Sequence, residues 1–127
     1  MTLLDHTILH VANPSISLQF YRDILGFRYE GKAGPFEVVR VNADLTLDLM
    51  QSSNNAQTHL AFSVDRPTFD AVLNKLRERD IPFGGGVLER DGRIAANAFG
   101  ARGMAQAFYF YDPDQHNLEL RLYATVS

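Results

Sequence analysis

Apolar residues recur along the chain at two spacings, and these spacings follow the same order in each half. In the first half, alternating apolar and polar positions predict a strand over residues 6–12. Apolar residues at helical spacing then run up to Gly26. β-rich runs between turn signals predict three more strands, at residues 27–32, 36–42 and 45–50.

Capping signals frame the first predicted helix. Asn13 is a favourable N-cap, Pro14 suits the first turn, and Gly26 suits a left-handed cap at the end. Helical spacing places a set of apolar residues on one side, which we expect to face the core. These residues are Ile16, Phe20, Ile24 and Leu25.

The same order returns in the second half. A strand is predicted over residues 58–64, followed by a helix from about Pro67 to Arg79. The apolar face of this helix consists of Phe69, Val72, Leu73 and Leu76. Further strands are predicted near residues 83–89, 93–98, 106–111 and 117–123. The glycine run at 84–86 has no following Lys-Ser/Thr, so it indicates a flexible or bulged stretch rather than a phosphate-binding loop.

A short motif marks the start of both halves. HTILHVANPS begins at His6 and HLAFSVDRPT at His59; each has Val five positions later and Pro eight positions later. The chain thus predicts an α+β fold of two tandem βαβββ modules within one domain, residues 1–127. We expect module one at about 1–50, a polar linker at 51–57 and module two at about 58–127. The modules should form a cup-shaped mixed sheet with the helices on its outer face.

Strand alternation separates an apolar face from a mixed one. The apolar face should pack on the helices. The other face carries a set of ionisable residues at matching places in the two modules: His6 and Asp48 in module one, His59 and Glu119 in module two. Such a face is either simply solvated or the wall of a cup that is partly dry and partly polar. Small and apolar neighbours favour the cup; they are Ile8, Met50, Ala61 and Tyr123.

Composition narrows the range of functions. The 127 residues are 46% hydrophobic and 21% charged, with a net charge of −3, which suits one globular domain. No basic patch favours nucleic acid or an anionic membrane, and no apolar run is long enough to span a bilayer. The first residues lack the features of a signal peptide. There is no Cys, which excludes disulfides, thiolate nucleophiles and Cys-ligated zinc, and we expect a cytoplasmic protein.

Six segments together resemble the vicinal oxygen chelate superfamily, which includes glyoxalase I, extradiol dioxygenases, fosfomycin-resistance transferases and bleomycin-resistance proteins. The segments are LDHTILHV, SLQFYRDILGF, LTLDLM, THLAFSV, FDAVLNKLRERDIPF and FYFYDPDQHNLEL. The resemblance implies a metal held by His6, His59 and Glu119. Asp48 occupies the place of a fourth ligand found in glyoxalase I-like members. Gln115 stands where relatives usually have Gly, which puts the conformation of that turn in question.

Two imidazoles and one carboxylate leave open positions on a divalent metal, here Fe, Mn, Zn or Ni. A small substrate with vicinal oxygens can chelate there, and the metal acts as a Lewis acid in lyase, isomerase, dioxygenase or transferase chemistry. Glu119 and Asp48 are the candidate catalytic residues, with Asp48 acting as a ligand, a general base or a support for bound water. The alternative is a non-catalytic binding protein that sequesters small molecules or drugs.

We also expect a homodimer with two-fold symmetry, whose metal site is built within one chain or shared between two.

Several other polar residues have open roles. His10 should line the cup rather than bind metal, and His116, in a turn, should be solvated. Arg102 and Arg121 suit an anionic substrate, although Arg121 equally suits a neighbouring strand carboxylate. In the FYFY run at 108–111, either the phenylalanines or the tyrosines face the cup, and the sequence leaves both open.

Overall fold

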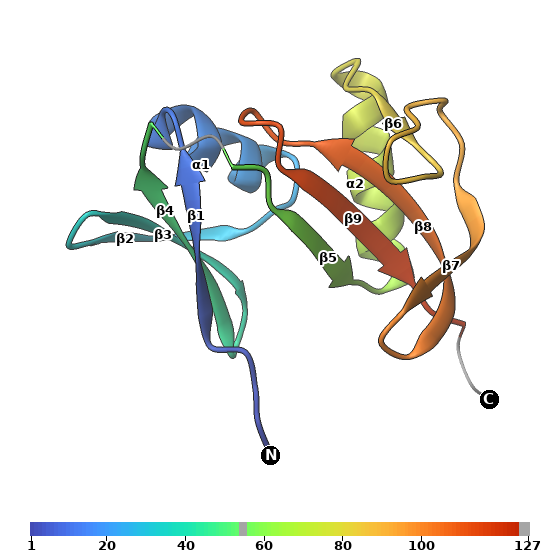
Figure 1. Ribbon diagram of the computed structural model, residues 1–127, viewed down its shortest axis with the longest axis horizontal. Helices are drawn as coiled ribbons and strands as arrows, with labels where there is room; N and C mark the ends of the chain where they lie inside the picture. The colour runs from blue at the N-terminus through green and yellow to red at the C-terminus, as the bar shows by residue number, and fades with distance from the viewer. Residues whose placement is uncertain (54–55, 125–127) are drawn as a thin grey trace. The chain divides into compact units, whose positions relative to one another are not determined.

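The computed structural model describes residues 1–53 and 56–124, and the chain divides into two compact units, Met1–Thr58 and His59–Ser127 (Figure 1). In the described residues there are two helices and nine strands, in one mixed sheet per unit, so the predicted α+β class is confirmed. The expected linker at 51–57 lies partly outside the described residues. No helix in the described part of the chain is long and apolar enough to cross a membrane.

The first unit is a four-stranded sheet with one helix. Its elements are β1 (His6–Val11), α1 (Pro14–Asp23), β2 (Arg28–Ala33), β3 (Phe36–Asn42) and β4 (Leu45–Gln51). The strand order is β1-β4-β3-β2, with β1 and β4 parallel and the other pairs antiparallel. The helix α1 contacts β2, β3 and β4.

The predicted caps of α1 are confirmed, but its buried face was only partly anticipated. Asn13 Oδ1 accepts hydrogen bonds from the backbone N–H groups of the first turn, and Gly26 has a φ of +72°. Ile16 was expected in the core and is instead 52% exposed. The buried row runs instead through Ser17, Tyr21 and Ile24, which are spaced four and three residues apart, and the Tyr21 ring stacks on Phe27.

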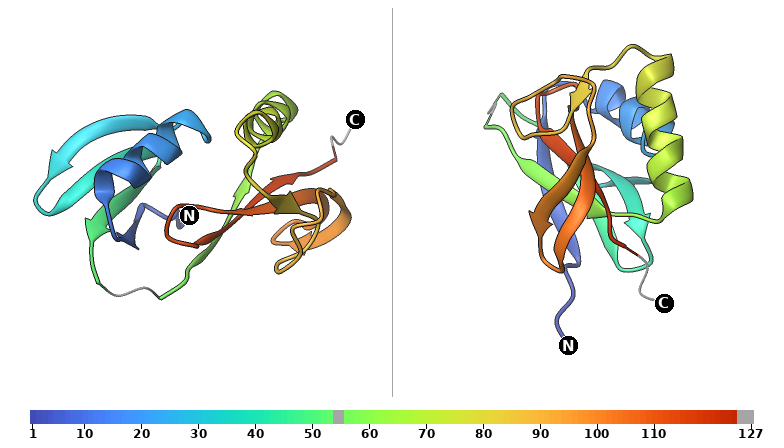
Figure 2. Two further views of the ribbon diagram at one scale, coloured as in Figure 1. Left: turned by 90° about the horizontal axis from the view of Figure 1, so that it is seen from above. Right: turned by 90° about the vertical axis from the view of Figure 1, so that its right-hand side faces the viewer.

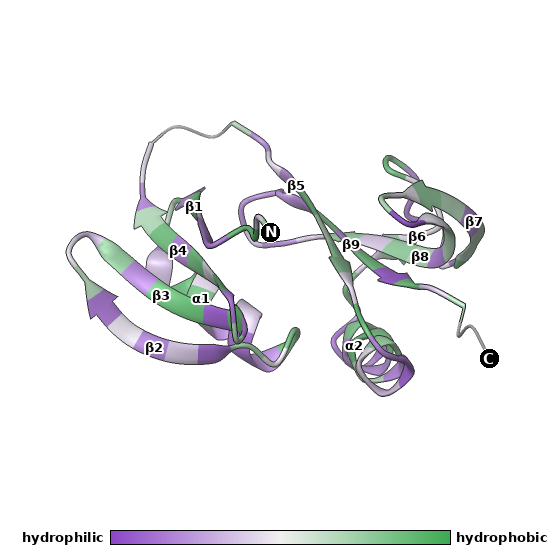
Figure 3. Ribbon diagram, turned by 90° about the horizontal axis from the view of Figure 1, so that it is seen from below, coloured by the Kyte–Doolittle hydropathy of each residue, from purple (hydrophilic) through white to green (hydrophobic). Residues whose placement is uncertain are grey.

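The second unit, which runs from green to red in Figure 2, repeats this plan with one additional strand. Its elements are β5 (His59–Ser63), α2 (Arg66–Glu78), β6 (Phe83–Gly84), β7 (Ala95–Gly100), β8 (Gly103–Tyr111) and β9 (Asn117–Leu122). The strand order is β5-β9-β8-β6, and β7 pairs with β8. The helix α2 buries the four apolar residues that its periodicity predicted, and its coil carries both hydrophobic and hydrophilic stretches (Figure 3).

The core of the second unit decides the orientation of the FYFY run. Phe108 and Phe110 are fully buried, and the Phe108 ring lies 4.8 Å from that of Phe69 on α2. Side chains alternate along a strand, so Tyr109 and Tyr111 point to the opposite face. The tyrosines, rather than the phenylalanines, therefore lie on the face that carries Glu119.

The internal repeat extends to the strand register. In the first unit β1 runs parallel to β4, and Ile8 lies opposite Asp48. In the second unit β5 runs parallel to β9, and Ala61 lies opposite Glu119. Each carboxylate thus has the same place relative to the histidine that opens its unit.

The strand predicted at 83–89 is wrong in length, because β6 ends at Gly84. A Cβ at Gly84 would lie 2.2 Å from the carbonyl oxygen of Glu89, so the glycine lets the following loop fold back on the strand. Asp91 Oδ1 accepts the Gly85 N–H, and the Phe83 carbonyl accepts the Gly92 N–H at 2.8 Å. The glycine run therefore allows the following loop to pack closely against β6.

A tight turn joins β8 to β9. Asp112 Oδ1 accepts the backbone N–H groups of Asp114 and His116, at 2.8 and 2.9 Å. Gln115 has a φ of +65°, so the turn adopts the left-handed conformation without a glycine. His116 was expected to be solvated and is only 1% exposed, because the turn folds back and places it inside the unit.

We expect Gln115→Gly to stabilise the protein by about 1 kcal/mol and raise Tm by a few degrees, because it removes the steric cost of a left-handed non-glycine residue. Thermal unfolding by circular dichroism measures the change. Gln115→Ala is the control, since it shortens the side chain but keeps the Cβ. An equal gain in the alanine variant would show that the side chain, and not the backbone, is responsible.

Candidate functional site

The second unit brings together two of the residues predicted from the sequence. His59 opens β5, Glu119 lies in the middle of the adjacent β9, and His59 Nε2 is 3.2 Å from Glu119 Oε1. The Glu119 residue is 4% exposed, whereas the His59 side chain is 44% exposed. The pair thus joins a buried carboxylate to an imidazole that solvent or a ligand can reach.

Tyr109 forms a side wall for this pair. It lies opposite Glu119 in the β8–β9 register, and its ring stacks on that of His59 at 6.2 Å between centroids. Burial and the negative charge of Glu119 raise the pKa of Tyr109 above its ordinary value, so the phenol stays neutral. The stacking holds the imidazole plane in place beside the carboxylate.

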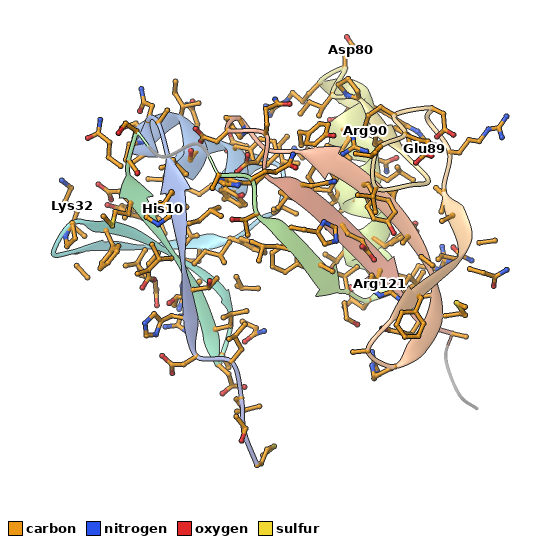
Figure 4. The ribbon with its side chains drawn as sticks, viewed as in Figure 1. His10, Lys32, Asp80, Glu89, Arg90 and Arg121 are labelled. Carbon is orange, nitrogen blue, oxygen red and sulfur yellow. The ribbon has the colours of Figure 1, made fainter. Side chains whose placement is uncertain are left out.

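Arg121, which is labelled in Figure 4, lies two residues beyond Glu119 on β9. Its residue is only 4% exposed. A guanidinium has five N–H donors, and here there are five acceptors for them. Nε donates to the Tyr123 hydroxyl at 3.2 Å, and Nη1 donates to the Phe99 carbonyl at 3.0 Å and to Glu119 Oε2 at 2.6 Å. Nη2 donates to the carbonyls of Ala98 and Gly103, at 2.9 and 3.0 Å.

This network decides the role of Arg121. With every donor engaged, the guanidinium has none left for an anionic substrate, and the carboxylate-partner interpretation is confirmed. The two carboxylate oxygens of Glu119 are divided, with Oε2 held by Arg121 and Oε1 facing His59. Gly100 is required nearby, because a Cβ there would lie 2.3 Å from the guanidinium.

A cavity of about 310 Å³ lies beside the pair, within the second unit. Its polar lining includes His59, Glu119, Arg121, Arg102 and Tyr123, and the end of β7 with the turn after it contributes residues 99–101. It is large enough for a small organic molecule. The cavity therefore combines a possible ligating pair with space for a substrate.

The remaining predicted site residues lie in the first unit. His6 Nδ1 is 2.7 Å from Asp5 Oδ2, and the pKa of His6 is raised because it hydrogen bonds this carboxylate. Asp48 Oδ1 accepts the Thr46 hydroxyl at 3.0 Å, and His10 is half-buried. Neither unit, over its described residues, gathers three or more His, Asp or Glu side chains in a metal-binding group. The complete ligand set stays a prediction.

The chemistry of the second-unit pair fits a divalent metal. Two ligands in neighbouring coordination positions, with bonds of about 2.1 Å each, lie about 3 Å apart. The separation of 3.2 Å between His59 Nε2 and Glu119 Oε1 matches this requirement. The hydrogen bond from Arg121 to the other carboxylate oxygen is the kind of outer contact that orients a metal ligand.

The chain belongs to the glyoxalase/bleomycin resistance protein/dioxygenase superfamily, whose family model matches residues 3–120. The predicted resemblance to the vicinal oxygen chelate superfamily is therefore confirmed.

Among individual relatives, the solved structure of oxidase ChaP-H1 has a TM-score of 0.85 and 33% identity, covering 98% of each chain. The metallothiol transferase FosB of Staphylococcus epidermidis is 25% identical over 94% of this chain and 81% of its own length. The fosfomycin resistance protein FosX of Listeria monocytogenes is 17% identical with a TM-score of 0.69, covering 98% of this chain and 95% of its own, and shares the fold.

Sequence reasoning missed the central place of Arg121 and the stacking of Tyr109 on His59. The alternation along residues 117–123 does place Glu119, Arg121 and Tyr123 on one face, which is the signal that was available. No comparable signal in the sequence predicts that the β7–β8 hairpin folds back over that face.

We expect Arg121→Met to lower the free energy of unfolding by about 3 kcal/mol or more, because it leaves the buried Glu119 carboxylate without its cation. Urea unfolding measures the loss. Arg102→Met, which removes an exposed arginine from the same hairpin, should cost roughly 1 kcal/mol or less.

Arg121→Met can destabilise the protein in two ways, by leaving the Glu119 charge unpaired or by removing the hydrogen bonds to the hairpin carbonyls. The double variant Glu119→Gln with Arg121→Met separates these two causes. It should recover part of the stability, because no unpaired charge remains. A double variant as unstable as Arg121→Met alone would assign the loss to the carbonyl contacts of the hairpin instead.

Proposed function

We propose that this protein is a metal-dependent enzyme in which His6, His59 and Glu119 hold one divalent metal ion. The observation that carries the proposal is the His59–Glu119 pair, 3.2 Å apart and open to a cavity of about 310 Å³. His6 has the corresponding register position in the first unit and supports the third ligand. The substrate is a small molecule that binds through two neighbouring oxygen atoms.

When bound, the metal supplies Lewis acidity and stabilises negative charge on substrate oxygen. The residues of the chain orient and support it. Arg121 fixes Glu119 so that one carboxylate oxygen is presented to the site, and Tyr109 holds the plane of His59. Asp48 is proposed as a fourth ligand or a general base, with Thr46 holding one of its oxygens.

The relatives suggest the order in which reactions should be tested. The oxidase ChaP-H1 is 33% identical and the metallothiol transferase FosB is 25% identical, so oxygen-dependent oxidation comes first and thiol transfer second. A ligand set of two histidines and one carboxylate suits Fe or Mn, and these metals also suit oxidation chemistry. A lyase or isomerase using Zn or Ni remains within the proposal if Asp48 is a ligand.

The binding test is metal content after purification without added metal. Wild-type protein should carry about one metal ion per site, and His59→Ala should lose most of it, because second-unit ligation then rests on Glu119 alone. Elemental analysis by mass spectrometry gives the stoichiometry. His10→Gln is the matched control, since His10 lies four residues after His6 on the same strand but outside the proposed set.

Wild-type protein that reconstitutes with none of Fe, Mn, Zn or Ni would exclude the metal proposal. If such protein still bound a bulky small molecule tightly, the non-catalytic, sequestering function would take its place.

We further propose that the protein is a homodimer in which the first unit of one chain completes the site of the other. Mixing His6→Ala chains with His59→Ala chains tests this arrangement. In a shared site, a mixed dimer recombines an intact His6 with an intact His59, so metal binding returns in part. Each variant alone should bind little metal, and light scattering should report a dimer.

Mixed chains that form dimers and still bind no metal would place each site within one chain. A monomer that binds one metal ion would exclude the dimer-dependent site.

A further inference from the structure

Tyr123 follows the end of β9 and lines the same cavity as His59 and Glu119. Its hydroxyl oxygen accepts two hydrogen bonds, from the Arg102 backbone N–H and from Arg121 Nε, both at 3.2 Å. A phenol oxygen has two lone pairs and one hydrogen. With both lone pairs engaged, the hydroxyl hydrogen is directed elsewhere, and over residues 1–53 and 56–124 no side chain or carbonyl accepts it.

The surroundings of Tyr123 are positively charged. The Arg102 guanidinium lies over its ring at 4.2 Å from the centroid, and that of Arg121 lies at 5.1 Å. The hydrogen bond from the Arg102 backbone and then that from Arg121 lower the pKa of Tyr123 below its ordinary value. A more acidic phenol is a stronger hydrogen-bond donor, and its preferred acceptor is a negatively charged oxygen.

Arg102 adds further donors at the same place. Its Nη2 donates to the Ser63 hydroxyl at 3.0 Å, which fixes the guanidinium against Tyr123. In the described part of the chain, the other guanidinium N–H groups have no hydrogen-bond acceptor. Arg102 thus differs from Arg121, whose donors are all engaged by the protein.

We propose that Tyr123 donates its hydroxyl hydrogen to a negatively charged oxygen of the substrate, with the Arg102 guanidinium beside it as a second donor. The substrate is then a small oxyanion, such as a carboxylate, a phosphate or a phosphonate. This proposal rests on the proposed function in that the cavity beside His59 and Glu119 is the substrate cavity. His59 and Glu119 hold the metal at one part of the wall, and Tyr123 with Arg102 binds the anionic group at another.

The test uses inorganic phosphate as the probe and metal-free, chelator-treated protein, with binding followed by calorimetry and by NMR shifts of the Arg102 backbone amide. Tyr123→Phe should weaken phosphate binding by about tenfold or more, the effect of one hydrogen bond to an anion. Arg102→Gln should weaken it at least as much. Tyr111→Phe is the matched control: its ring also lies against an arginine, Arg90 at 3.9 Å, but does not line this cavity.

A second readout covers the case in which Tyr123→Phe is less stable. Ultraviolet titration of wild-type protein should show one tyrosine that ionises at lower pH than the others, and phosphate should shift that ionisation upward. The direction follows because the bound anion favours the neutral, hydrogen-donating phenol. Phosphate that leaves the tyrosine titration unchanged would overturn the proposal.

Two further outcomes would overturn it. One is phosphate affinity that is equal in Tyr123→Phe and wild type. The other is binding abolished by Arg66→Gln and kept in Tyr123→Phe, which would place the anion at Arg66, in the neighbouring cavity of about 720 Å³ that Arg66, Arg102 and Tyr123 all line. Since all measurements use metal-free protein, a failure of the metal proposal appears separately, in the metal content of the wild type.

Discussion

The geometry of the second unit depends on the burial of one guanidinium group. A charged side chain removed from water is tolerated only when its charge and its donors are satisfied. Arg121 meets this condition with one carboxylate, one phenol oxygen and three backbone carbonyls. Because the carbonyls belong to the β7–β8 hairpin, the same bonds that balance the charge also fix the hairpin over β9 and form a wall of the cavity.

This constraint has a consequence for the proposed metal site. Glu119 is already charge-balanced by Arg121, so the His59–Glu119 pair is preorganised before any metal binds. A carboxylate that shares its charge with a guanidinium is also a weaker base toward a metal. In the proposed site, the metal would therefore retain more of its Lewis acidity, and the protein would bind the metal less tightly.

The pattern of apolar and polar residues predicted most of the fold, because strand and helix periodicities reflect which side of each element is buried. The face of α2 and the correspondence of Asp48 with Glu119 followed from spacing alone. Predictions were wrong where a neighbouring segment changes the exposure of a position. His116 is buried by its own turn, and the strand expected at 83–89 ends early because Gly84 allows a close backbone approach. Arg121 was ambiguous because its acceptors come from a hairpin whose path no local signal specifies.

The two copies of the repeat treat their carboxylates differently. Two residues beyond Glu119 stands Arg121, whereas two residues beyond Asp48 stands Met50, opposite His10 in the strand register. Asp48 instead accepts a hydrogen bond from the hydroxyl of Thr46, a neutral donor, and its charge acts on His6, whose pKa is raised first by Asp5 and also by Asp48. A carboxylate bonded to a buried cation is held in one orientation, whereas a neutral hydroxyl donor holds a carboxylate less firmly. Duplication thus supplies two equivalent strand positions, and the residue two places further along each strand gives the two carboxylates different surroundings.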